Sequence, residues 1–297
     1  MKRLFSIVLA CLLVLGVFSA CSKQESGEES RSLKITYDAH YENMSESSVR
    51  AYTALCEAVM NGEEEAAFGH TMTDDVNTLY YTSFPLSALV SELHQTEDTN
   101  GFKIVYANDA DAHKELVEEF SKKVFEIQDA CGLGSVSNDR FVFNLYTYIC
   151  ENVTFDDTVL APYETIMNGS GSLQSISQAF EYILCQSGIK ASHITNFDSG
   201  VNVLSAVYFS NAWYLFCPAL EIKNTEGKGL EYFAMSFERA STTLGVDTLT
   251  YSDLTEVDPT YFAETEYDKL ESATSYTDDS GDIVAECSDG QFTLPLK

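Results

Sequence analysis

Cationic residues are scarce in this sequence. Its 297 residues include 17 Lys plus Arg against 46 Asp plus Glu, so the formal net charge is -29. A polyanion of this density repels phosphate backbones, and no cluster of four or five Lys or Arg offsets the mean charge. Nucleic-acid binding is therefore excluded, and any partner is expected to be neutral or cationic.

Proline and tryptophan are also few, at 5 and 1 residues, and none of the 8 cysteines forms a Cys-x-x-Cys pair. The wide cysteine spacing argues against a zinc site and against a small disulfide-dependent scaffold. We expect no metal and no cofactor. The apolar fraction of 45% is enough to bury a large core, so one or two folded domains are predicted.

The first residues have the pattern of an export signal. Lys2 and Arg3 precede a run without charged residues, Leu4 to Phe18, which is shorter than the roughly 20 residues that a spanning helix needs. The run ends in Ser19-Ala20-Cys21, which resembles a bacterial lipobox, in which the cysteine becomes lipidated. A second candidate ends at Cys11, but it leaves an apolar core of only six residues.

This interpretation predicts a lipoprotein with a signal peptide over residues 1–20, and acylated Cys21 with a flexible tether over residues 21–35. The partner of that anchor is the lipid bilayer of a bacterial cell membrane. The rest of the chain is expected on the extracytoplasmic face. Six cysteines then remain, for which burial in the core is expected and one or two disulfides stay open: Cys56, Cys131, Cys150, Cys185, Cys217 and Cys287.

Apolar periodicity predicts a helical layer over residues 36–135. Helical spacing is found from Glu46 to Met60 and from Leu116 to Ile127, and short helices interrupted at Pro85 are expected between Thr71 and Leu93. Phe102 to Tyr106 is expected to form a short strand. A further helix is predicted from about Asp139 to Glu151.

The character of the chain changes after Gly169. Gly171-Ser172 opens a predicted helix that Gly188 closes. Three strand-like runs follow, and the turn Ser210-Asn211 joins the last two; the runs are Ala191 to Phe197, Asn202 to Phe209 and Ala212 to Phe216. Helices followed by antiparallel hairpins indicate an α+β fold.

Residues 241–297 are expected to form an acidic extension, with 13 acidic residues against two lysines. A hairpin turn at Ser288-Asp289-Gly290 links two predicted strands, Ile283 to Cys287 and Gln291 to Leu296. These strands either join the main sheet or form a small appendage.

Several strings in the middle of the chain resemble one known family. YICENVTFD (148–156), GSGSLQSISQAFEYILCQSGIKA (169–191) and WYLFCPA (213–219) occur in the order and at the intervals of the transglutaminase-like domain, a papain-related cysteine-enzyme fold. The resemblance implies a helix packed on an antiparallel sheet, with the core over residues 136–240. It also implies a Cys-His-Asp site at the start of that helix.

The residues at the family's catalytic positions differ from that triad. The nucleophile position is Leu173, followed by Gln174; the position of the general base is Asn202, and that of the orienting acid is Cys217. Leucine cannot ionise, and an amide neither accepts nor donates a proton near neutral pH. Trp213 is expected to pack beside this vestigial site, although it could instead stack on a sugar. We therefore expect a pseudoenzyme, a binding or scaffolding module for a protein, peptide or glycan ligand.

Two other functions stay open. The first is a hydrolase or peptidase with a relocated nucleophile, for which Cys185 and His193 are the candidates in the core. Cys185 is more simply a packing residue, and His193 an edge histidine or a satisfied core histidine. The second is a solute-binding lipoprotein with two lobes and a hinge, against which the order of helices and strands counts.

Overall fold

The structure, a computed structural model, describes residues 31–69, 74–97, 100–195, 203–225, 227–279 and 281–296. Cys21 and Asn202, two residues singled out in the sequence, lie outside these ranges. The buried apolar side chains form one cluster that extends from Tyr41 to Leu294. Among the described residues, no helix combines the length and the apolar character that crossing a bilayer requires.

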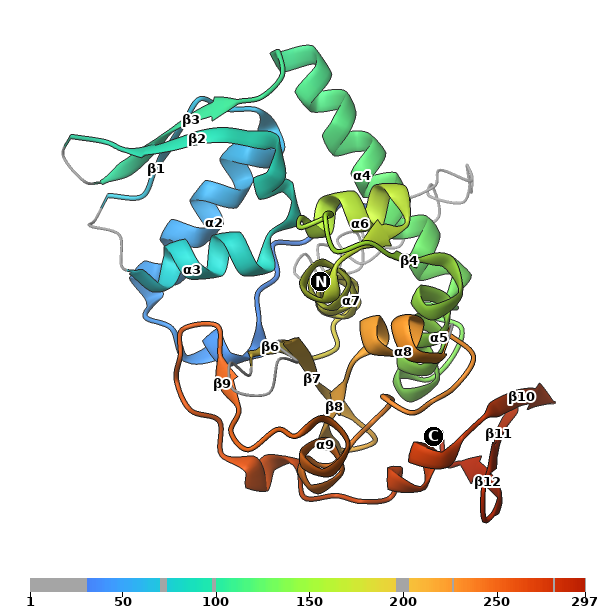
Figure 1. The fold of residues 1–297 in the computed structure, drawn as a ribbon. Helices are drawn as coiled ribbons and strands as arrows, with labels where there is room; N and C mark the ends of the chain where they lie inside the picture. Colours follow the sequence, from blue (N-terminus) through green and yellow to red (C-terminus); the bar gives the residue numbers. More distant parts are fainter. Residues whose placement is uncertain are drawn as a thin grey trace, which may run out of the picture. The chain divides into compact units, whose positions relative to one another are not determined.

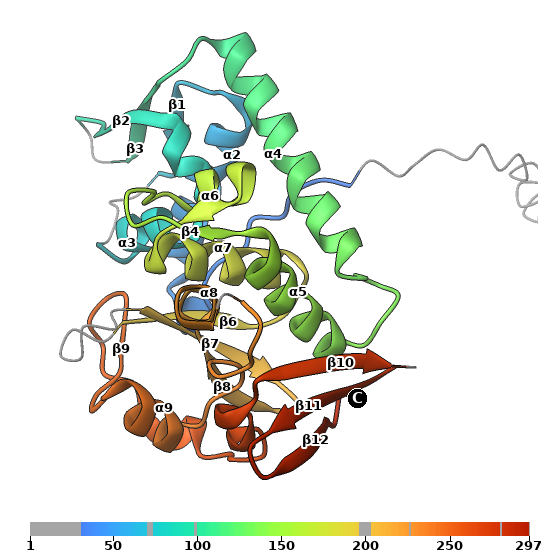
Figure 2. The ribbon, with the colours of Figure 1, turned by 45° about the vertical axis from the view of Figure 1, so that its right-hand side comes forward.

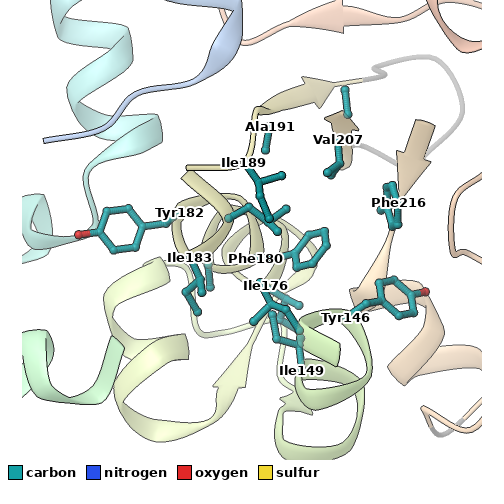
Figure 3. Packing of buried hydrophobic residues seen from close by; sticks show 14 of the residues in the cluster. Tyr146, Ile149, Ile176, Phe180, Tyr182, Ile183, Ile189, Ala191, Val207 and Phe216 are labelled. Atoms are coloured by element: carbon teal, nitrogen blue, oxygen red, sulfur yellow. The ribbon is translucent and has the colours of Figure 1, made fainter. Parts of the chain in front are cut away.

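Helix α7 (Leu173–Gln186) lies at the centre of this core (Figure 1). The hydroxyl of Ser172 caps its first turn and Ser175 returns the hydrogen bond, which completes a capping box. After the last turn, Gly188 takes the left-handed conformation (φ 81°) that a residue with a side chain rarely adopts. Ile176, Phe180 and other apolar residues of α7 are buried against the surrounding elements (Figure 3).

A four-stranded antiparallel sheet packs against one side of α7. Its strand order is β8-β7-β6-β9. Ser210 and Asn211 have positive φ angles of 49° and 68°, the conformation of the predicted two-residue hairpin turn. The strands are β6 (Ala191–Thr195), β7 (Val203–Phe209), β8 (Ala212–Phe216) and β9 (Thr250–Tyr251).

Helices α5, α6 and α8 pack around the remaining sides of α7 (Figure 1). The predicted helix near Asp139 is confirmed as α5, and the helix near Leu116 as α4, which packs on α6. A short parallel pair, β4 with β5, leads into α7. The bounds are α4 (Ala110–Ala130), α5 (Asn138–Asn152), β4 (Thr154–Phe155), α6 (Pro162–Asn168), β5 (Ser170–Gly171) and α8 (Pro218–Thr225).

The N-terminal layer contains a sheet as well as helices. The helix predicted from Glu46 is confirmed, and the predicted strand Phe102 to Tyr106 is the middle strand of an antiparallel sheet of order β1-β3-β2. The helical prediction up to Leu93 is wrong from Val90 onward, because that segment forms β2. Its elements are η1 (Ala39–Asn43), α2 (Glu46–Asn61), β1 (Glu65–Ala67), α3 (Asp74–Ser83), η2 (Pro85–Leu89), β2 (Val90–Gln95) and β3 (Gly101–Tyr106).

The misassigned strand has a physical reason. The side chains of β2 show no strict alternation of buried and exposed positions. Its backbone is fixed instead by pairing with β3, in which Leu93 lies opposite Ile104 and Gln95 opposite Phe102. Cross-strand pairing of this kind leaves no local periodicity for the sequence to reveal.

The C-terminal segment divides between the main sheet and a separate meander. Its strand β9 extends the main sheet, pairing with β6, whereas β10, β11 and β12 form a sheet of their own (Figure 2). The appendage alternative for the C-terminal strands is therefore the correct one. The remaining elements are α9 (Phe237–Leu244), η3 (Pro259–Phe262), η4 (Asp268–Ser272), β10 (Ser275–Asp279), β11 (Asp282–Cys287) and β12 (Gly290–Leu294).

Contacts from α5 hold the meander in place. The guanidinium of Arg140 bonds to the carboxylate of Asp278 and to the carbonyl oxygen of Gly281. The ring of Phe143 meets that of Tyr276 edge-on, with centroids 5.5 Å apart. Together, the helices and antiparallel sheets confirm the α+β class.

Candidate functional site

The start of α7 is the position at which the resemblance places a nucleophile. Leu173 is the first helical residue and packs, half-buried, against the core, while Gln174 is exposed. The polar atoms of this turn bond to one another. Ser175 Oγ accepts from the Ser172 amide at 2.9 Å and lies 3.0 Å from Thr165 Oγ1. Short hydroxyls thus satisfy the helix start internally, and Leu173 adds no group that could transfer a proton.

Cys217, at the position that the resemblance assigns to an orienting acid, follows the last residue of β8. It is fully buried, and its Sγ lies 3.5 Å from the carbonyl oxygen of Val203, the first residue of β7. Burial raises the pKa of the Cys217 thiol to about 12, although backbone hydrogen bonds lower it. The thiol is therefore protonated at neutral pH and can offer only a weak hydrogen bond.

His193, on β6, faces α7, and both its Nδ1 and its backbone amide have hydrogen-bond partners. Its Nδ1 lies 3.0 Å from Glu181 Oε2, and Ser205 donates to Glu181 Oε1 at 2.6 Å. The backbone amide of His193 donates to Asp38 Oδ2 at 2.6 Å. Burial lowers the pKa of His193, but Glu181 and Asp38 outweigh it and raise the pKa above its usual value. His193 is thus a buried core histidine whose Nδ1 is paired with Glu181, in agreement with the core alternative of the prediction.

Cys185, the candidate for a relocated nucleophile, lies in surroundings that suppress a thiolate. Its Sγ is 4.0 Å from the carbonyl oxygen of Ala191, and it shares a small cavity with Asp38 and Glu181. Burial raises the pKa of the thiol, and these two carboxylates raise it further. Its place in the last turn of α7 adds the negative end of the helix dipole. A reactive cysteine needs the opposite electrostatics.

The cysteines within the described ranges carry no disulfide. All six described cysteines are free thiols, and four are buried in the core. Among the residues that the structure describes, no group of three His, Cys, Asp or Glu side chains is placed to hold a metal ion.

Trp213 lies on the face of the sheet that is turned away from α7. It pairs with Tyr208 across the strands, and the two rings meet edge-on at 5.6 Å. Side chains alternate along each strand, so Trp213 shares a face with Ala206 and Ser192, whereas His193 points the other way toward α7. Trp213 is half-buried and packs against the core from this outer face.

A groove of about 370 Å³ covers this outer face. The sequence does not reveal it, because its walls come from five separate parts of the chain with no shared motif. η1 and the C-terminal segment supply most of the lining, and η3 packs directly on β8. The lining residues are Ala39, His40, Glu42, Asn43, Lys190, Ser192, Ala206, Trp213, Tyr251, Tyr261 and Phe262.

Comparison with known proteins gives little similarity. No family model and no curated protein matches the chain. Among solved structures, a "putative cysteine protease" from Cytophaga hutchinsonii is 13% identical with a TM-score of 0.28, over 38% of this chain and 43% of that one. A "putative protease" from Parabacteroides distasonis is 11% identical with a TM-score of 0.29, over 56% of this chain and 34% of that one. The chain thus spans less than half the length of either structure.

Proposed function

We propose that this protein is a lipid-anchored, extracytoplasmic binding or scaffolding module whose transglutaminase-like core, residues 136–240, does not catalyse. The observation that carries the proposal is the chemistry at the family's catalytic positions. Leu173 has no ionisable atom, Cys217 is a buried thiol whose pKa is raised to about 12, and the third position is Asn202. Acyl transfer needs a thiolate and an imidazolium, and these residues supply neither.

The surroundings of the remaining candidates support the same proposal. The imidazole of His193 is held by Glu181, and the thiol of Cys185 lies among carboxylates. The hydrolase alternative requires these two side chains to act as an activated pair. Glu181 orients the His193 imidazole as the acid of a triad would, so the alternative fails at Cys185, where burial and nearby carboxylates suppress the thiolate that catalysis needs. One continuous apolar cluster, rather than two lobes, counts against a hinged solute-binding lipoprotein.

Assays of amide hydrolysis and transamidation on the purified full chain test the catalytic part. We expect rates equal to those of buffer, with an active papain-type enzyme as the positive control. Turnover that disappears in Cys185→Ser or Cys217→Ser, but persists in Cys131→Ser, would overturn the proposal. Cys131 is the matched control because it is buried and far along the chain from both positions.

The anchor is tested separately through Cys21. In a bacterial host we expect the wild-type chain in the membrane fraction, with acyl groups detected by mass spectrometry on the mature N-terminus. The Cys21→Ser variant should lose the acyl groups and leave that fraction. Acylation that persists in this variant would move the lipidation site elsewhere.

The net charge bears on the partner. At -29 the chain repels polyanions, so the proposed ligand is neutral or cationic. The same charge is suited to holding a tethered protein off an anionic membrane surface.

A further inference from the structure

The groove on the outer face of the main sheet has the make-up of a small-molecule site. Its volume of about 370 Å³ lies within the roughly 300–1,000 Å³ of typical ligand pockets. Three partly exposed aromatic rings line it, those of Trp213, Tyr251 and Tyr261, and the side chain of Tyr261 is 59% exposed. Large exposed rings in a hollow are apolar surface that a ligand can cover.

One wall of the groove is held rigidly. The imidazole of His40 stacks on the ring of Tyr251, with centroids 3.8 Å apart and planes 14° from parallel. Its Nε2 lies 2.9 Å from Asp253 Oδ2, so η1 and the C-terminal segment are joined across the chain. The amide of His40 donates to the buried Asp38 carboxylate. A ring fixed in this way loses little conformational entropy when a ligand binds.

The charged groups around the groove are already paired with one another. Lys190 Nζ lies 2.8 Å from Glu42 Oε2. Asp253 accepts a hydrogen bond from His40. Partial burial raises the pKa of the Asp253 carboxyl, but the hydrogen bonds from His40 and Thr255 together outweigh it and lower the pKa below its usual value. Each of these charged groups therefore has a partner: Lys190 is paired with Glu42, and Asp253 with His40. The groove therefore favours a ligand without net charge.

The floor of the groove disfavours an extended peptide. Ser192 and Ala206 lie opposite each other on adjacent strands, β6 and β7, whose backbone groups are bonded to one another in the sheet. A peptide that binds in extended form gains most from unpaired backbone groups at a sheet edge. The polar groups that a ligand can reach here belong to side chains and not to the backbone. They include the amide of exposed Asn43 and the carboxylate of Glu42, both at the rim.

From these features we infer that the groove binds a neutral saccharide. A pyranose ring has apolar faces that cover the rings of Trp213 and Tyr261, and hydroxyls that donate to Glu42 and bond to Asn43. The inference rests on the proposed binding role, because it names the site and the ligand class of that role. The site lies on the sheet face opposite α7, away from Leu173.

The single tryptophan of the chain makes the test direct, since Trp213 lines the groove and is the only indole that can respond. The purified full chain is titrated with cellotriose, maltotriose and tri-N-acetylchitotriose while tryptophan emission is recorded. We expect a saturable change with at least one of them. Calorimetry on Tyr261→Ala should show at least tenfold weaker binding of that sugar.

Tyr81→Ala is the matched control, because Tyr81 is a tyrosine of similar exposure, 52%, on α3 and does not line the groove. It should bind the sugar as the wild type does. The inference is overturned if none of the three sugars binds, if Tyr81→Ala weakens binding as much as Tyr261→Ala, or if a neutral peptide library binds in their place.

Failure of this inference can be told apart from failure of the proposed function. Sugar binding together with amide turnover overturns the non-catalytic role and upholds the groove. No sugar binding together with no turnover overturns the groove and leaves the non-catalytic role intact.

Discussion

The buried carboxyl of Asp38 should make the stability of this protein fall as the pH rises. Asp38 caps η1, where its two oxygens accept from the amides of His40 at 2.8 Å and His193 at 2.6 Å. Burial nevertheless raises its pKa from 3.8 to about 6. The desolvation of a carboxylate thus outweighs two charge-assisted hydrogen bonds.

The sign follows from proton linkage. Because the folded-state pKa of Asp38 lies above the unfolded value, its contribution to stability is complete below about pH 3.8 and is lost as the pH rises through about 6. At about 1.4 kcal/mol per pH unit, this displacement corresponds to about 3 kcal/mol. The raised pKa of His193 acts in the same direction.

Asp38→Asn removes this ionisation while keeping the shape of the side chain. Placing an amide NH₂ against a backbone N–H costs about 1–3 kcal/mol, and this cost does not depend on pH. The free energy of unfolding of the variant should therefore gain about 2.4 kcal/mol relative to wild type between pH 4 and pH 8, because part of the total of about 3 kcal/mol is already lost at pH 4. Urea denaturation followed by circular dichroism at five pH values measures the difference.

Asp258→Asn provides the control for this comparison. Asp258 is exposed, and hydrogen bonds from Thr260 lower its pKa below 3.8, so its titration is over before pH 5. The difference in the free energy of unfolding between Asp258→Asn and wild type should be constant from pH 5 to pH 8. A constant difference for Asp38→Asn across the same range would refute the reasoning.

Three further outcomes are expected. Leu173→Cys should hydrolyse a fluorogenic amide no faster than wild type, since the thiol would lack an imidazole partner, and a rate increase would show that a base is present. Gly171→Ala should lower the midpoint in scanning calorimetry, because the new methyl group would lie 2.5 Å from Thr165 Oγ1, an overpacking worth about 1–3 kcal/mol. Arg140→Ala should speed hydrogen exchange in β10 about tenfold, because it removes the ion pair between α5 and Asp278. Arg50→Ala, which removes an exposed ion pair on α2, should leave exchange in β10 unchanged. Equal exchange rates in the two variants would contradict the role of Arg140 in holding the meander in place.

Local signals predicted much of the fold. The helix from Glu46, the capped helix after Ser172 and the hairpin at Ser210-Asn211 each depend on residues within a few positions of one another. Helical periodicity and turn chemistry are written into such short stretches. The chemistry of Leu173, at the position where the resemblance places a nucleophile, is equally local, because a side chain without an ionisable atom cannot gain one on folding.

Contacts between distant residues had to come from the tertiary structure. Asp38 meets His193 across 155 positions of sequence, and His40 meets Asp253 across 213. No pattern in either segment identifies its partner, since each pairing is decided by how the sheet, η1 and the C-terminal segment pack together. The pKa of Asp38 depends on this packing in the same way.

Trp213 shows most clearly which properties follow from the local sequence and which depend on tertiary packing. The sequence alone determined that the chain has one tryptophan, that this residue belongs to a strand, and that the chain carries a net charge of -29. Only the tertiary structure decided which face of the sheet Trp213 occupies, because that depends on register with Tyr208 and on the arrival of η1 and η3 from far along the chain. Trp213 lines the groove because segments distant in the sequence pack around it, and short-range periodicity does not encode such long-range packing.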